Sequence, residues 1–344
     1  MTISIIIAVK TWQENLEDCV GRCLQLDYPD FEIIILPDSN IGTVPDKAIT
    51  INSKGTVPII VIPTGTVSPA NKRDVALKYA KGEILAFIDD DVYPQKDWLK
   101  NAAKNFLEPE VAAVGGPAVT PTEDNMRQKA SGLVYASFLV SAKFVYRYLP
   151  KDRQEVDDYP SCNFLVRKSI MQELGGFKTS FWPGEDTKLC LDITKRLNQK
   201  IIYDPEVLVY HHRRPLFLPH LKQIANYALH RGYFVKRYPQ TSLRISYFIP
   251  SLFLFVLVMG EFFSLFSIPL RITYFLGLSL YLSLVFIFSI IGAVPDLSRA
   301  KPQERELPLR ILLIPLVSSG IVLTHLTYGF YFIKGLLSKR LKEE

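Results

Sequence analysis

The chain has few cysteines, and they show no functional pattern. Only four of its 344 residues are cysteine, at positions Cys19, Cys23, Cys162 and Cys190. Their spacing is neither that of a metal-ligand set nor that of a disulfide framework, which argues against a zinc module and a stapled secreted domain. A reducing compartment is favoured. Because Cys19 and Cys23 lie four residues apart, we expect both to be small core residues of one helix.

Other features are missing as well. There is no internal repeat, low-complexity tract or Gly/Ser linker. Basic residues are not interleaved with aromatic ones as in a nucleic-acid groove, so we expect no nucleic-acid partner. The opening run 2–9 is apolar but has neither a basic flank before it nor a small-residue cleavage site after it. We therefore expect no secretory signal and a cytoplasmic catalytic domain.

Charge is nearly absent from three long stretches near the C-terminus. The first carries only Glu261, the second carries no charge, and the third is interrupted by Pro315 and His325. We predict helices at about 245–268, 272–294 and 309–336, because ~20 apolar helical residues cross a hydrocarbon core of roughly 30 Å. Residues 241–338 are therefore predicted to form a membrane domain with two or three apolar helices, in a multi-pass protein of the cell membrane.

Lysine and arginine flank these stretches unevenly, and this distribution predicts which loops lie on the cytoplasmic side of the membrane. The basic residues before the first stretch and after the second are Arg231, Lys236, Arg237 and Arg244, then Arg299, Lys301, Arg305 and Arg310. This pattern predicts that both flanks are cytoplasmic. Four more basic residues follow, Lys334, Lys339, Arg340 and Lys342, which a third full span would place outside. Either the third stretch is re-entrant or interfacial, or its basic tail is tolerated. The net charge of +6 is attributed to these flanks and to a phosphorylated substrate.

In the first part of the chain, short apolar strands alternate with helices. Strands are predicted at 3–9, 31–36, 59–62, 84–88, 111–114, 163–166, 201–203 and 207–210, and helices at 71–80, 97–106, 127–146, 168–174 and 187–197. This order predicts an α/β fold for residues 1–214, with a mostly parallel central sheet and helices on both faces. Residues 215–240 are predicted to form an amphipathic interface helix that leads into the membrane domain.

Asp89, Asp90 and Asp91 end the apolar run 84–88. Three adjacent carboxylates at the tip of a buried strand repel one another unless a cation or a cation-bound ligand neutralises them. Ligands of open α/β sheets bind at such strand tips. The triplet therefore predicts a site for Mg²⁺ or Mn²⁺ and a phosphate group. The alternative is an acidic turn that binds nothing.

A second acidic pair, Glu185 and Asp186, follows a Pro183-Gly184 turn and an aromatic residue, Trp182. Helix capping would account for one acid. A carboxylate beside a flat apolar face suits a sugar hydroxyl, because the carboxylate takes the proton and the sugar ring packs on the aromatic face. We predict Asp186 and Glu185 as catalytic residues, and Trp182 and Gly184 as acceptor-binding residues.

Polar residues also follow or precede other strands. Asp38, after the second strand, can accept hydrogen bonds from a nucleobase imide or a ribose hydroxyl, or it is simply a turn residue. Lys72 and Arg73 begin a helix, where arginine can bind a diphosphate in bidentate fashion. The run His211-His212-Arg213-Arg214 follows a strand, where a His could supply a metal ligand and an Arg a diphosphate clamp, as we expect for His211 and Arg213. One His and one Arg could instead face solvent or lipid headgroups, an alternative that stays open for His212 and Arg214.

The order of these motifs resembles family 2 glycosyltransferases, which are inverting enzymes with the nucleotide-diphospho-sugar transferase fold, called A-type. The motifs that carry the resemblance lie at 3–10, Asp38, 71–74, 82–91, 175–177, 184–186 and 209–211. They span about residues 1–235. The membrane-bound branch, which builds exopolysaccharides and lipid-linked glycans of the cell envelope, is the most similar.

The resemblance implies a role for each matching residue. Nucleotide-sugar contacts are implied for Ala8, Val9, Lys10, Asp38, Lys72, Arg73, Asp89 and Asp90. Asp89, Asp91 and His211 are implied at the metal, and His211, Arg213 and Arg231 at the diphosphate. Asp186 is implied as the base that activates the acceptor.

We therefore expect a glycosyltransferase that uses Mg²⁺ or Mn²⁺ and a nucleotide sugar, of which a UDP-sugar is favoured. Its acceptor is expected to be a hydroxyl of a membrane-associated lipid-linked glycan or polysaccharide. The Gln-x-x-Arg-Trp signature of processive synthases is missing, which favours one sugar per encounter. Two alternatives are transfer to polyprenyl phosphate and a catalytically idle membrane scaffold. A phosphatase is disfavoured because its aspartate would replace Ala8 or Val9.

Overall fold

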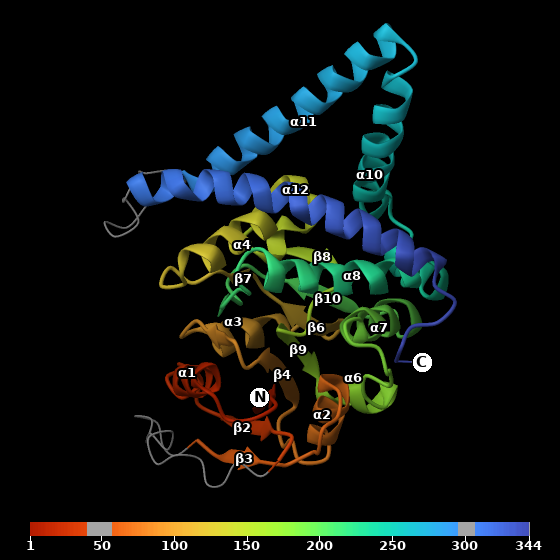
Figure 1. Cartoon of the computed structure of the whole chain (residues 1–344). Helices are drawn as coiled ribbons and strands as arrows, with labels where there is room; N and C mark the ends of the chain where they lie inside the picture. The colour runs from red at the N-terminus through yellow and green to blue at the C-terminus, as the bar shows by residue number, and fades with distance from the viewer. Residues whose placement is uncertain (40–56, 295–306, 344) are drawn as a thin grey trace. The chain divides into compact units, whose positions relative to one another are not determined.

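The computed structural model describes residues 1–39, 57–294 and 307–343, and the side chains of 307–309 are not described. The chain forms two compact units, which are treated separately (Figure 1). The first contains Met1–Val119 and Leu149–His211, and the second contains Thr120–Tyr148 and His212–Lys342. The segment Thr120–Tyr148 thus groups with the C-terminal helices, and the functional domain boundaries predicted at residues 214 and 240 stay predictions. Arg299, Lys301 and Arg305 lie outside the described residues.

The first unit is built on an eight-stranded sheet in the order β3-β2-β1-β4-β9-β6-β10-β8. The strands are β1 (Ile3–Ala8), β2 (Phe31–Leu36), β3 (Ile59–Val61), β4 (Ile84–Asp89), β6 (Val111–Gly115), β8 (Gln154–Val156), β9 (Asn163–Arg167) and β10 (Lys200–Tyr203). A smaller sheet, ordered β5-β11-β7, joins β5 (Val92–Pro94), β7 (Ala118–Val119) and β11 (Val209–His211).

The predicted mostly parallel sheet is confirmed, with two exceptions: β9 runs against its neighbours, and the edge strand β8 is antiparallel to β10. Strands β1, β2, β3 and β4 are parallel neighbours, and β6 and β10 are parallel to each other. In contrast, β9 is antiparallel to both β4 and β6. An apolar run predicts a buried strand but not its direction. Here β9 enters the sheet after a long excursion through residues 120–162 rather than after a single crossover helix.

Helices cover both faces of the large sheet. They are α1 (Glu14–Cys23), α2 (Pro69–Ala76), α3 (Trp98–Asn105), α6 (Lys168–Leu174), α7 (Glu185–Leu191) and the π-helical turn η3 (Asp192–Arg196). In Figure 1, α1 and α3 lie on one side of the sheet and α2 and α6 on the other. Helix α2 begins two residues before the predicted start, because Ser68 accepts a hydrogen bond from the Asn71 N–H and Pro69 occupies the first turn.

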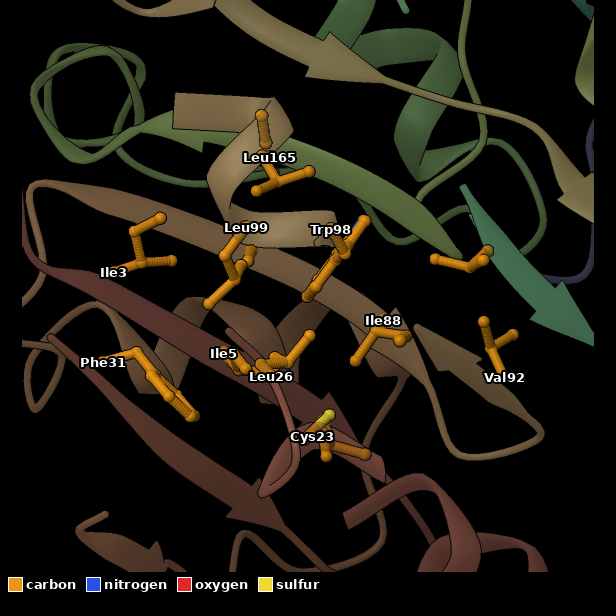
Figure 2. Close-up of a cluster of buried hydrophobic side chains, with 14 of the residues drawn as sticks. Ile3, Ile5, Cys23, Leu26, Phe31, Ile88, Val92, Trp98, Leu99 and Leu165 are labelled. Carbon is orange, nitrogen blue, oxygen red and sulfur yellow. The ribbon is translucent and has the colours of Figure 1, made fainter. Parts of the chain in front are cut away.

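The core on the α1 and α3 side is closely packed. Alternate residues of β1 and β4, including Ile5 and Ile88, meet Cys23 of α1 and Trp98 of α3 (Figure 2). Cys19 and Cys23 are both buried in this core, as predicted. A period of two along a strand sends these side chains to one face and leaves Phe87 for the other.

The second unit is helical. Its elements are α4 (Met126–Ala136), α5 (Phe138–Ser141), the 3₁₀ turn η2 (Ala142–Arg147), α8 (Leu218–Arg237), α9 (Pro239–Ser242), α10 (Ile245–Ser264), α11 (Ile268–Ala293) and α12 (Leu307–Leu337). The single helix predicted at 127–146 is broken, because Ser137 has extended backbone angles between α4 and α5.

Three described helices are long and apolar enough to cross a membrane, at Ile245–Ser264, Ile268–Ala293 and Arg310–Leu337. They lie within a few residues of the three predicted stretches. Helices α10 and α11 form a hairpin that projects from α12 (Figure 1), and most of their large apolar side chains are exposed. Helix α12 is different, since a third of its most apolar window is buried inside the protein (33%).

Candidate functional site

The site forms where β1, β2 and β4 end side by side. Ala8 pairs in register with Leu36 on one side and with Asp89 on the other. Because these strands are parallel, their carboxyl ends share one edge of the sheet, and the residues that follow them meet there. The backbone holds this edge together, since the Asp38 N–H donates to the Lys10 carbonyl oxygen (3.0 Å).

Lys72 closes this edge from helix α2. It is buried, and its Nζ donates to the carbonyl oxygens of Val9 and Leu36 and to Asp38 Oδ1. The hydrogen bond from Lys72 lowers the pKa of Asp38. Lys72 therefore fixes an ionised Asp38 at the strand tips. Because its ammonium already donates to three protein oxygens, a contact of Lys72 with the donor nucleotide sugar would compete with these hydrogen bonds.

Arg73 joins the two acidic groups that the sequence separates. Its Nη2 donates to Asp89 Oδ1 at 2.7 Å, and its Nη1 donates to Glu185 Oε1 at 3.0 Å. Only 2% of Arg73 is exposed, and its guanidinium lies 5.8 Å from the ring of Phe177. Burial alone would lower the pKa of Arg73, but Asp89 and Glu185 raise it. Each terminal nitrogen thus donates to one carboxylate, and the predicted bidentate contact of this buried guanidinium with a diphosphate stays a prediction.

Asp74, the next residue of α2, anchors the segment Gly175-Gly176-Phe177, which we call the glycine loop. Its Oδ1 accepts a hydrogen bond from the Phe177 N–H (2.8 Å). Gly176 has φ +92, and a Cβ there would lie 2.3 Å from Asp74 Oδ1. Only glycine combines this backbone conformation with so close an approach. Phe177 then packs edge-on against Phe87 of β4, with ring centroids 5.3 Å apart.

The aspartate triplet is divided among three partners. Asp89 pairs with Arg73, Asp90 accepts from Gln13 Nε2, and Asp91 Oδ1 lies 3.4 Å from His211 Nε2. Burial, then Asp91 and Asp89, raise the pKa of Asp90 to about 6. Asp91 meets His211 because β5 follows the triplet directly and pairs with β11, with Val92 opposite His211.

Glu185 and Asp186 begin α7 in different surroundings. Glu185 is 4% exposed, and its second oxygen accepts from the Gly184 N–H (3.1 Å). Burial and Asp186 raise the pKa of Glu185 to about 7, and Arg73 opposes this shift. Asp186 is half-buried, and its carboxylate accepts from the Thr187 N–H (2.7 Å) and, weakly, from the Ser161 N–H (3.4 Å).

The predicted acceptor residues lie just before this pair. Trp182 is 46% exposed, so its ring is open to a ligand, and Gly184 is buried with φ +120. Two predicted nucleotide-sugar contacts lie at the end of β1, where Ala8 is half-buried and Lys10 is exposed.

Two predicted diphosphate residues belong to the second unit. Arg213 donates through Nε to Thr120 Oγ1 (3.3 Å) and lies over the rings of Tyr135 and Tyr148. Arg231 lies 5.0 Å from the ring of Tyr247. Their contacts with a diphosphate stay predictions.

The predicted metal set is only partly brought together. In the described residues 1–39, 57–294 and 307–343, no three His, Cys, Asp or Glu side chains form a group that could hold a metal ion. Of the predicted set, Asp91 and His211 are in contact, and Asp89 is paired with Arg73 instead. A cation here would need oxygen ligands from a bound substrate or water.

Sequence reasoning missed several contributors. Asp74 lies within the 71–74 motif, and its position beside Arg73 was the available signal. Gln13 and Ser161 approach the site only through tertiary contacts, and no sequence spacing indicates them.

Replacing Arg73 with glutamine should destabilise the first unit strongly. Glu185 would remain buried without its cation, at a cost of about 3–5 kcal/mol. All three tryptophans, Trp12, Trp98 and Trp182, lie in this unit, so their fluorescence during urea unfolding of the detergent-solubilised chain follows it alone.

The matched control is Arg22→Gln, which removes an exposed pair with Asp18 and should cost about 1 kcal/mol or less. The double variant Arg73→Gln, Glu185→Gln should recover part of the loss. An Arg73→Gln effect no larger than that of the control would contradict the assigned pairing.

The family model described as glycosyl transferase family 2 matches residues 4–175, half of the chain. A dolichyl N-acetyl-alpha-D-glucosaminyl phosphate 3-beta-D-2,3-diacetamido-2,3-dideoxy-beta-D-glucuronosyltransferase from Methanococcus voltae is 24% identical over 343 residues, which cover 97% of each chain. The pre-mycofactocin glycosyltransferase of Mycobacterium tuberculosis is 28% identical over 146 residues, 42% of this chain. That match spans only 30% of the Mycobacterium relative's length.

A solved structure shares the fold. The mannosyltransferase PcManGT from Pyrobaculum calidifontis, in complex with GDP-Man and Mn²⁺, superposes with a TM-score of 0.53 at 17% identity and covers 98% of this chain and 88% of its own. The predicted A-type architecture is therefore confirmed. Since the family match runs from β1 through the aspartate triplet to the glycine loop, the chain belongs to glycosyl transferase family 2.

Proposed function

We propose that the chain transfers a sugar, with inversion, from a nucleotide-diphosphate donor to a hydroxyl of a lipid-linked glycan or polysaccharide at the membrane. The ion pairs of Arg73 with Asp89 and Glu185 carry this proposal. They bring the strand-tip carboxylates, which could hold a cation for the donor diphosphate, into one site with the carboxylates that could accept the proton of an acceptor hydroxyl.

Asp38 is the proposed contact for the nucleoside. Lys72 holds it ionised at the strand tips, and its side chain is 24% exposed. An ionised carboxylate accepts hydrogen bonds only, so it favours a ribose hydroxyl or a base with an imide N–H, such as uracil.

Asp91 and His211 are the proposed protein ligands of a divalent cation. These two side chains suit Mg²⁺ or Mn²⁺, because a carboxylate and an imidazole in contact can supply two ligands, while Asp89 is held by Arg73. Diphosphate oxygens and water would complete the coordination. When bound, the cation would offset the negative charge that develops on the leaving diphosphate.

Asp186 is the proposed base, and Glu185 is a positioning residue. Both oxygens of Glu185 are engaged by Arg73 and by the Gly184 N–H in a buried environment. Asp186 is more accessible, and its Oδ2 accepts a long hydrogen bond from the Ser161 N–H (3.4 Å). A proton acceptor must reach the acceptor hydroxyl, which favours the more accessible carboxylate.

The proposed reaction is a single in-line displacement. The acceptor oxygen bonds to the anomeric carbon while the bond from that carbon to the diphosphate oxygen breaks, and the electron pair leaves with the diphosphate. The hydroxyl proton passes to Asp186. Trp182 would support the acceptor sugar with its exposed ring face.

The acceptor class rests on two supports. The Methanococcus relative, which matches over nearly the full chain, is named for a lipid-phosphate-linked acceptor. The three apolar helices would also hold the enzyme at the membrane, where such acceptors reside.

Replacing Asp186 with asparagine should lower kcat by about 10² to 10⁴, because the acceptor loses its proton acceptor, and should leave the donor KM nearly unchanged. The assay is metal-dependent release of nucleoside diphosphate from a panel of nucleotide sugars with membrane extract as acceptor. Asp192→Asn is the control, since Asp192 pairs with Lys188 one turn further along.

Normal turnover by Asp186→Asn with a hydroxyl acceptor would refute the base assignment. If that variant kept activity only toward polyprenyl phosphate, transfer to an already ionised acceptor would replace the proposal. Absence of any transfer or donor hydrolysis by the unaltered chain would favour an idle scaffold.

Replacing Asp91 with asparagine should remove the metal dependence of nucleotide binding, since one of two proposed protein ligands loses its charge. Calorimetric titration of nucleoside diphosphate with and without Mn²⁺ measures this. The unaltered chain and the control Asp18→Asn should bind at least about tenfold more tightly with Mn²⁺. Equal Mn²⁺ enhancement in Asp91→Asn would exclude Asp91 as a ligand.

A further inference from the structure

Helix α12 packs along α8 over the whole length of α8. Near the start of α8, His220 Nε2 lies 2.9 Å from Thr324 Oγ1. Near its end, Lys236 Nζ donates to the Ser338 carbonyl oxygen at 2.7 Å. Between these contacts the backbones nearly touch, since a Cβ on Gly232 would lie 2.1 Å from a carbonyl oxygen of α12. Helices in such close contact share their surroundings, so α8 and this half of α12 lie at the same depth relative to a membrane.

The first half of α12 packs against the same unit through other residues. Val317 and Ile321 are buried in a cluster with Val134 of α4 and with Leu216, which precedes α8. A Cβ on Gly320 would lie 2.6 Å from Val134 Cγ2. One face of α12 is therefore covered first by α4 and then by α8.

Both covering helices are too polar to lie in hydrocarbon. The side chains of Lys222, Lys236 and Arg237 in α8 and of Arg127 in α4 are charged and exposed. Lysine and arginine inside a bilayer are costly and rare. The contact of α8 with Thr324 places Lys222 beside the middle of α12. A crossing α12 would therefore carry Lys222 toward the centre of the membrane.

Helix α12 also lies across the base of the hairpin formed by α10 and α11. Ser251 Oγ, near the start of α10, donates to the Gly329 carbonyl oxygen (3.0 Å). Ser318 Oγ donates to Ser289 Oγ, near the end of α11 (3.0 Å). The buried residues of α11, which is described throughout, all lie in its second half: Val285, Ser289 and Ala293. A third span would run beside the hairpin toward its tip, whereas the hairpin projects away from α12 (Figure 1).

The outward face of α12 is a mainly apolar stripe. Leu312, Ser319, Phe330 and Leu337 are exposed, and at 100° per residue they fall within about 20° of one another around the helix. Val317, which packs against α4, lies about 140° away from the first of them. A helix that has protein on one side and an exposed apolar stripe on another suits the boundary between lipid headgroups and acyl chains.

We infer that, of the three apolar helices, only α10 and α11 cross the membrane, and that α12 lies along its surface with α4 and α8. A re-entrant third segment would have to reverse its direction in the membrane, whereas α12 is one continuous helix from Leu307 to Leu337. The basic tail, with Lys339, Arg340 and Lys342, then stays on the same side as α8, which the positive-inside pattern requires. This topology does not depend on the proposed reaction.

Cysteine labelling of the full chain in proteoliposomes, with a membrane-impermeant maleimide, tests the topology. The four natural cysteines are buried, so the unaltered chain should give little background. Capture of the vesicles through an N-terminal affinity tag makes one orientation predominate, and Lys222→Cys reports the side on which α8 lies. Lys342→Cys in the tail should be labelled from the same side as Lys222→Cys. Phe266→Cys, in the turn between α10 and α11, should be labelled from the opposite side.

Two labelling patterns would overturn the inference. Labelling of Lys342→Cys from the same side as Phe266→Cys, opposite to Lys222→Cys, would show that α12 crosses. Labelling of all three variants from one side would show that the hairpin does not cross.

The depth of the outward stripe gives a second measurement. Nitroxide labels at Leu312→Cys, Ser319→Cys and Phe330→Cys are compared by their accessibility to oxygen and to a water-soluble nickel complex. If α12 lies along the surface, all three labels should have one shallow depth. A crossing α12 would place the Ser319→Cys label about 10 Å deeper than the Leu312→Cys label, because seven helical residues rise about 10 Å. That gradient would contradict the inference.

Discussion

The site depends on one buried guanidinium. Arg73 binds Asp89 at a strand tip and Glu185 at the start of a helix 112 residues away. Without a cation between them, these carboxylates would repel each other in a poorly hydrated environment. Arginine suits this position better than lysine, because its planar fork can donate to two separate carboxylates at once. The same contact therefore supports the fold and brings the donor and acceptor sides of the proposed reaction together.

Helix α2 distributes this support through three consecutive residues. Successive helical side chains point about 100° apart, so Lys72, Arg73 and Asp74 reach three different parts of the site. Lys72 fixes Asp38, Arg73 joins the acidic groups, and Asp74 holds the glycine loop. The proposed chemistry is left to side chains less constrained by these contacts, Asp186 and the Asp91–His211 pair. A rigid frame with a few accessible groups is the arrangement that positions reacting atoms most reproducibly.

Apolar runs and strand-tip acids made much of this predictable from sequence. The strands β1, β2 and β4, the triplet and the Glu185-Asp186 pair follow from local patterns. The direction of β9 does not follow from a local pattern, because an apolar run looks the same whether the strand is parallel or antiparallel to its neighbours. The burial of Arg73 also escaped prediction, since its partners are distant in the chain and a charged residue at a helix start usually faces solvent. Hydropathy found α12 but could not tell whether its apolar face meets lipid or protein, and only the packing against α8 distinguishes them.

The most direct measurement is a double-mutant cycle between Asp89→Asn and Glu185→Gln, scored on both urea unfolding and sugar transfer. These two side chains do not bond to each other, and Arg73 is the group that links them. If Arg73 couples the two acidic groups, the effects should be non-additive by about 0.5–3 kcal/mol. Effects that add within about 0.5 kcal/mol on both scales would contradict a single site organised around Arg73.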